Sequence, residues 1–130
     1  MIYTSGMFKE PTDTLEIAQY RKLDTIAKYI QLKENEQHLD IGCGWGTLLR
    51  HYAKKYRSFS TGCTLAEKQV EWGMDLAKKE KVDDRISYLC CDYRDIPAKT
   101  GNKQWDKITC LEMAEHVGIK NFQDFLLQVN

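Results

Sequence analysis

Three glycines at alternate positions carry the clearest chemical signal in this sequence. Gly42, Gly44 and Gly46 follow Asp40, between a short apolar run that predicts a strand and a stretch with helical spacing. Glycines at such a turn let the backbone bend tightly, and they let a ligand approach the N–H groups at the N-terminus of the helix. A plain tight turn needs one glycine or two, so three of them indicate a ligand-binding loop.

The spacing of these glycines indicates which ligand the loop binds. A dinucleotide-binding loop has the pattern G-x-G-x-x-G and holds pyrophosphate at the helix N-terminus. The pattern here is D-x-G-x-G-x-G, which resembles the S-adenosylmethionine loop of Rossmann-like methyltransferases, whose ligand has no phosphate. A nicotinamide-dependent enzyme is the weaker alternative. The resemblance implies cofactor contacts from His38, Leu39, Asp40, Ile41, Gly42, Cys43, Gly44, Trp45 and Gly46.

Helical and strand-like segments alternate along the chain and predict the frame that positions this loop. Such alternation is typical of an α/β fold, in which helices cover a parallel sheet. We expect a Rossmann-like class I methyltransferase sheet with strand order 3-2-1-4 and an N-terminal helix, truncated after the fourth strand. Residues 1–130 would be the cofactor-binding half of a single methyltransferase domain. Strands are expected at residues 38–41, 58–62, 85–91 and 105–111, and helices at 15–30, 47–56 and 64–81 and from 121 onward.

Two helix starts carry the pattern of a capping box, in which a polar side chain caps the helix three residues before a glutamate. Asp13 with Glu16 is predicted to begin the first helix, and Thr64 with Glu67 the third. His51 is expected on the exposed side of its helix. The last helix is expected to leave Phe122, Phe125 and Leu126 without the neighbours that would bury them.

Composition narrows the class of protein. Of 130 residues, 19 are Lys or Arg and 19 are Asp or Glu, and zero net charge argues against a nucleic-acid binder. The mean hydropathy is −0.56, and no segment predicts a membrane span or a signal peptide. The five cysteines form no C-x-x-C pair, which argues against a zinc site. We expect buried free thiols and a soluble chain facing a reducing cytosolic compartment.

Several further segments resemble one family of lipid methyltransferases. The string T-L-A-x-x-Q at residues 64–69, the N-terminal segment at 3–8, the turn at 92–95 and E-H-V-G at 115–118 are similar to the cyclopropane-fatty-acyl-phospholipid synthase family. Within it, residues 3–6 and 106–118 look most like the sphingolipid C9-methyltransferases. The resemblance covers essentially the whole chain.

This resemblance implies roles for individual residues. Tyr3 and Thr4 would contact the cofactor. Tyr93 and Arg94 would border the adenine, and Glu115 would help to hold a bicarbonate ion that serves as the base. The ribose side would be bound by Thr64, Leu65, Ala66, Glu67, Lys68 and Gln69, with Gln69 in place of the carboxylate that usually follows the second strand.

The implied reaction is methyl transfer from S-adenosylmethionine to a lipid alkene, through a carbocation on the lipid. C9-methylation of an 8-unsaturated sphingoid base is the first expectation. Cyclopropane formation on phospholipid acyl chains, and a truncated non-catalytic chain that only binds the cofactor, are the alternatives. The fragment alone is expected to be inactive, and the full-length parent to be associated with a membrane. A metal site at Glu112, Glu115 and His116 is disfavoured because one histidine with two glutamates is a sparse ligand set. Trp45 is expected either to line the cofactor cleft or to pack against other side chains.

Overall fold

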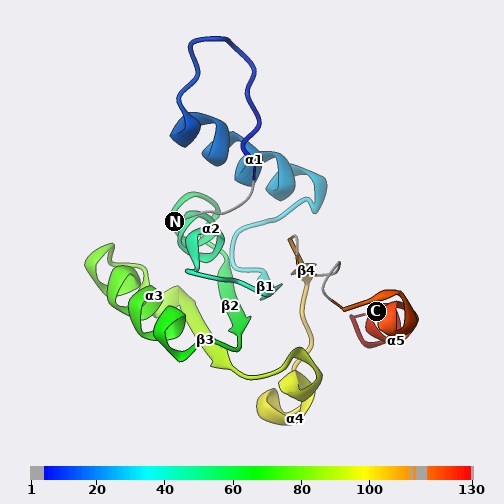
Figure 1. The fold of residues 1–130 in the computed structure, drawn as a ribbon. Coiled ribbons are helices and arrows are strands. Elements are labelled where there is room, and N and C mark those ends of the chain that lie inside the picture. Colours follow the sequence, from blue (N-terminus) through cyan, green and yellow to red (C-terminus); the bar gives the residue numbers. More distant parts are fainter. Residues whose placement is uncertain (1–4, 112, 114–116, 130) are drawn as a thin grey trace.

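The computed structural model of the chain describes residues 5–111, 113 and 117–129. Its strands form one parallel sheet with the order β3-β2-β1-β4 (Figure 1). This order confirms the expected 3-2-1-4 arrangement. Parallel neighbours need crossover connections, which the alternating helices provide. The strands are β1 (Gln37–Ile41), β2 (Phe59–Thr64), β3 (Ile86–Cys90) and β4 (Lys107–Thr109).

The helices cover both faces of the sheet, as the alternation predicted. On one face, α1 packs on α2, and α2 and α3 pack on the strands β2 and β3. On the other face lie α4 and α5. The short helix α4 was not predicted. It has Pro97 in its first turn and ends at Gly101, whose φ is +64°. The helices are α1 (Leu15–Tyr29), α2 (Thr47–Tyr56), α3 (Glu67–Lys79), α4 (Ile96–Thr100) and α5 (Phe122–Val129).

Side chains of β1 alternate between the two faces of the sheet because successive residues of a strand point in opposite directions. Leu39 and Ile41 belong to the apolar cluster that includes Ile96, with Val129 of α5 packed against it. His38 and Asp40 point to the other face, where the His38 ring lies 5.0 Å from the ring of Tyr52 on α2. The apolar half of β1 therefore faces α4 and α5, and its polar half faces α2.

Some expected boundaries were wrong for local reasons. The first helix is capped by Thr14, whose side chain accepts a hydrogen bond from the Ile17 amide. Asp13 instead pairs with Arg21 and accepts from the Lys9 and Glu10 amides, contacts that hold the pKa of its carboxyl well below the usual range. The fourth strand spans only Lys107–Thr109, the three residues that pair with β1.

Burial of the cysteines and of Phe125 in the last helix also departs from expectation, whereas Phe122 and Leu126 are exposed, as expected. Cys43, Cys63 and Cys91 are buried free thiols, but Cys90 is exposed and Cys110 is half-buried. Phe125 is only 4% exposed, because it packs edge-on against the Tyr93 ring at 5.3 Å between centroids. None of the helices in the described part of the chain is long and apolar enough to cross a membrane.

Candidate functional site

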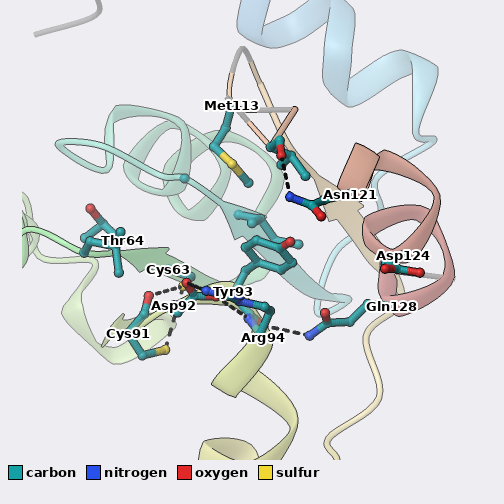
Figure 2. Close-up of a pocket in the computed structure, with 14 residues that line it drawn as sticks. Cys63, Thr64, Cys91, Asp92, Tyr93, Arg94, Met113, Asn121, Asp124 and Gln128 are labelled. Carbon is teal, nitrogen blue, oxygen red and sulfur yellow. Dashed lines mark hydrogen bonds and ion pairs between the residues drawn. The ribbon is translucent and has the colours of Figure 1, made fainter. Parts of the chain in front are cut away.

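A cavity of about 590 Å³ lies at the carboxyl ends of β1, β2 and β3, with α5 on its far side (Figure 2). Open parallel α/β sheets bind their ligands at this edge, where the strand order reverses. The walls come from segments far apart in the sequence. They are residues 41–42 after β1, 63–65 at the end of β2, 91–94 after β3, Met113 and Val117 after β4, and Asn121, Asp124 and Gln128 near or on α5.

The cavity brings together part of the residue set that the sequence predicted. Ile41, Gly42, Thr64, Leu65, Tyr93 and Arg94 line it. The remaining predicted positions among the described residues do not, and they are His38, Leu39, Asp40, Cys43, Gly44, Trp45, Gly46, Ala66, Glu67, Lys68 and Gln69. Tyr3, Thr4 and Glu115 lie outside the described residues.

The glycine loop has the backbone that its sequence implied. Gly42, Gly44 and Gly46 have φ angles of +79°, +53° and +71°, in the left-handed region that glycine adopts at little cost. A Cβ added at Gly44 would meet no protein atom within 4 Å. The space beside Gly44 is therefore open, which is the condition for a ligand to approach this backbone closely.

Thr64 and Gln69 meet directly at the edge of the cavity. The Thr64 hydroxyl donates to Gln69 Oε1 at 2.7 Å and accepts from the Ala66 amide at 3.3 Å. The expected capping box is wrong, because Ala66 occupies the N-cap position of α3. With its Oε1 accepting from Thr64, the Gln69 side chain has its amide N–H₂ group available as the donating end.

The cation at the cavity wall is already paired. Arg94 donates from Nε and Nη2 to the two carboxylate oxygens of Asp92, at 2.8 and 2.7 Å. These bonds, with the one from the Arg94 amide, lower the pKa of Asp92 to about 2. Among the described residues that line the cavity, Arg94 is the one cationic side chain. The wall therefore suits a ligand without phosphate groups.

A buried hydrogen-bonded chain lies behind the glycine loop, on the α2 face of the sheet. The Thr109 hydroxyl donates to Asp40 at 2.6 Å, so His38 Nε2, at 2.8 Å, must donate to Thr109. His38 Nδ1 is then the acceptor for Ser60, at 3.2 Å. This order fixes the neutral tautomer of His38. His38 and Asp40 therefore join the strands to one another and do not face the cavity.

The structure shows the surroundings of two aromatic residues, Trp45 and His51, for which predictions were made from the sequence. The Trp45 ring meets the Trp72 ring edge-on at 5.2 Å between centroids, so Trp45 packs against α3 and does not line the cavity. The expectation that His51 is exposed was wrong. Its side chain is 11% exposed, and Nε2 lies 2.7 Å from Oδ1 of Asp24 on α1. Burial of His51 follows from α1 lying over α2, which the periodicity of α2 alone does not reveal.

Several cavity residues were missed by the sequence reasoning. Asn121, Asp124 and Gln128 are spaced three and four residues apart, which places them on one face of the helical segment. This polar stripe, beside the apolar side of the helix that carries Phe125, could have been recognised from the sequence. Cys63 and Cys91, whose Sγ atoms lie 3.8 Å apart, and Met113 carried no such signal because only the packing of the sheet ends brings them to the wall.

The chain is similar to known proteins over its whole length. A sequence model of the family described as mycolic acid cyclopropane synthetase matches residues 1–130. A sphingolipid C9-methyltransferase of Komagataella phaffii is 47% identical over 136 residues, which cover 99% of this chain and 28% of that protein. The Candida albicans sphingolipid C9-methyltransferase is 45% identical and matches over 98% of this chain and 26% of its own length. The chain thus spans about a quarter of the length of these relatives.

Solved structures show the same fold. The cyclopropane synthase MmaA2 from Mycobacterium tuberculosis superposes with a TM-score of 0.87 and 26% identity, covering 98% of this chain and 43% of that one. Coclaurine N-methyltransferase, solved with N-methylheliamine and S-adenosylhomocysteine, superposes with a TM-score of 0.67 and 27% identity, covering 70% of this chain and 27% of that one. The sheet is that of a class I methyltransferase.

Proposed function

The chain belongs to the mycolic acid cyclopropane synthetase family, and from that premise we propose that its cavity binds S-adenosylmethionine. The cavity lies beside the glycine loop and its described lining offers no unpaired cation for a phosphate. Its volume of about 590 Å³ is in the range of cavities that hold small ligands. A solved relative at 27% identity carries S-adenosylhomocysteine, which supports the same class of ligand here.

Within this proposal the residues of the wall have distinct tasks. The open side of Gly44 admits the methionine and ribose portion to the backbone of the loop. Gln69, oriented by Thr64, donates from its amide to the ribose hydroxyls. Tyr93 and Arg94 border the adenine beside the apolar surface of Ile41 and Met113. The cofactor supplies an electrophilic methyl group, and the task of the chain is to hold it in a fixed direction.

We further propose that the longer protein transfers this methyl group to a lipid alkene, at C9 of an 8-unsaturated sphingoid base. The observation that carries this substrate is the 47% identity to a sphingolipid C9-methyltransferase across 99% of the chain. Cyclopropane formation is the second candidate, favoured by the superposition on MmaA2 at a TM-score of 0.87. A lipid substrate implies that the longer protein works at a membrane surface, and the free cysteines suit a reducing compartment.

The remaining roles rest on the resemblance of sequence segments alone. We propose that Tyr3 and Thr4 contact the cofactor and that Glu115 helps to hold a bicarbonate base. We also propose that residues 1–130 form the cofactor-binding part of a larger catalytic domain, since the relatives are about four times as long as the matched region.

The test of the cofactor assignment is a matched pair of glycine substitutions. Gly44→Val places a side chain in the open space beside the glycine loop, whereas Gly101→Val does so at the end of α4. Both glycines have positive φ, +53° and +64°, and neither has protein atoms near its added Cβ, so the backbone strain is similar. In calorimetry, we expect Gly44→Val to abolish binding of S-adenosylhomocysteine and Gly101→Val to retain it. Unchanged affinity in Gly44→Val, or tighter binding of NAD by the wild type, would contradict the assignment.

A further inference from the structure

The side chain of Tyr88 on β3 ends between two glycines of different elements. Gly46 is the N-cap of α2, and Gly73 lies in the middle of α3. A Cβ added at Gly46 would overlap the Tyr88 hydroxyl oxygen, and one added at Gly73 would lie 2.5 Å from it. Neither position can carry a side chain while Tyr88 stays where it is. The third glycine of the loop is thus required by a protein contact as well as by its positive φ.

Burial raises the pKa of Tyr88 to about 12, and the neighbouring Arg50 guanidinium opposes this rise. The Tyr88 hydroxyl oxygen is buried and has no hydrogen-bond partner of ordinary geometry among the described residues. The neighbouring Arg50 offsets part of the cost of burying this oxygen, so phenylalanine would change stability little here. What the oxygen does supply is volume between Gly46 and Gly73.

The loop is also held by Arg50 on α2. Arg50 is 6% exposed, and its Nη1 donates to the Trp45 carbonyl at 2.7 Å. Its guanidinium lies 5.5 Å from the centre of the Trp72 ring and 3.4 Å from Glu80. The Trp45 carbonyl is therefore fixed by a residue that α3 holds in turn. Tyr88 and Arg50 are neighbours, and they contact consecutive residues of the loop, Gly46 and Trp45.

We propose that Tyr88 is a positioning residue for the cofactor, which acts through Gly46 to set the separation between the glycine loop and α3. Gly44 is two residues from the contact, so the width of this gap decides where the Gly44 backbone stands beside the cavity. The proposal rests on the proposed cofactor site. It adds a residue outside the cavity wall, on the opposite face of the sheet from Tyr93.

The first arm of the test separates affinity from stability with two Tyr→Phe variants. Tyr88→Phe removes only the hydroxyl oxygen between the two glycines, so we expect the unfolding temperature to change little while affinity for S-adenosylhomocysteine falls about tenfold, as small misplacements of binding groups do. Amide hydrogen exchange at residues 43–47 should become faster without ligand. The control is Tyr52→Phe, which removes a hydroxyl that donates to the Leu23 carbonyl at 3.3 Å. It should lower the unfolding temperature and leave affinity within twofold.

The second arm needs no ligand. Gly46→Ala should be strongly destabilising, and the double variant Gly46→Ala/Tyr88→Leu should be more stable than the sum of the two single effects predicts, because leucine withdraws the clashing end of the ring. Additive effects in this cycle would overturn the contact, and wild-type affinity and exchange in Tyr88→Phe would overturn the positioning role. Failure of the wild type to bind S-adenosylhomocysteine would instead refute the proposed function, and the exchange rates and the cycle would still decide the role of Tyr88.

Discussion

The buried residues His38 and Asp40 show how one environment moves two ionisable groups in opposite directions. Burial disfavours the charged form of each side chain. It lowers the pKa of His38 to about 4. It raises the pKa of Asp40 to about 7, a rise that the hydrogen bond from Thr109 partly offsets. Both groups are thus held neutral in mildly acidic solution, in line with the tautomer of His38 that the hydrogen-bonded chain requires.

These two pKa values predict opposing effects of pH on stability. Between pH 4 and 6.5 folded His38 binds fewer protons than unfolded His38, so its contribution to the free energy of unfolding rises with pH. Between pH 3.8 and 7 folded Asp40 binds more protons than unfolded Asp40, so its contribution falls with pH. We expect His38→Asn to give a free energy of unfolding that falls as pH rises from 4 to 6.5, and Asp40→Asn one that rises.

Urea denaturation of both variants at several pH values measures this difference. Each slope is limited to about 1.4 kcal/mol per pH unit, the value for one proton. In the wild type the two contributions largely cancel across the shared range. Identical pH slopes in the two variants would show that the shifts assigned to His38 and Asp40 are wrong.

Among the elements, α5 is the one that connects packing to the candidate site. Its apolar side is anchored by Phe125, which packs edge-on against Tyr93. Its polar side brings Asp124 and Gln128 to the cavity, and Gln128 Nε2 donates to the Tyr93 carbonyl at 3.2 Å. The helix and the turn after β3 therefore hold each other at the wall of the cavity.

Truncating Phe125 should loosen α5 at the cavity wall before it affects the sheet. We expect Phe125→Ala to abolish amide protection across residues 122–129 and to weaken binding of S-adenosylhomocysteine about tenfold, since truncating a buried phenylalanine typically costs about 3–5 kcal/mol. Leu127→Ala is the control, because Leu127 is on the same helix and 70% exposed. Equal exchange profiles for the two variants would mean that Phe125 does not anchor α5.

On the scale of the whole molecule, the described structure contains the cavity in which we propose that the cofactor binds. The chain spans about a quarter of the length of its relatives. We expect the 130-residue chain to bind S-adenosylhomocysteine without multiple turnover on sphingolipid or phospholipid alkenes. The longer protein should show multiple turnover on such a lipid alkene. Glu115→Gln in the longer protein should keep cofactor affinity within a few-fold and lose about 10²–10⁴-fold in rate, the usual contribution of a general base.

The assay is transfer of labelled methyl to each lipid, followed by analysis of the product. Turnover by the isolated chain would contradict the proposal that residues 1–130 are the cofactor-binding part of a larger domain. Wild-type turnover in Glu115→Gln would remove the proposed role of that carboxylate.

The sequence alone determined the features that depend on residues close together in the chain. Gly42, Gly44 and Gly46 predict the loop because a positive φ is a local property of the backbone. The helix at 47–56 matches the observed α2, because its apolar period is also local. The alternation of elements restricted the sheet to a few topologies, and the observed strand order is the one expected.

Only the tertiary structure decided which of these residues meet. Asp24 on α1 pairs with His51 on α2, and α5 supplies polar groups to the cavity. Tyr88 lies 42 residues after Gly46 in the numbering, yet its hydroxyl fills the space that this glycine leaves. Such contacts depend on how far α2, α3 and the strands approach one another. That approach is set by the volumes of many side chains packed together, and the pattern of a single segment does not contain it.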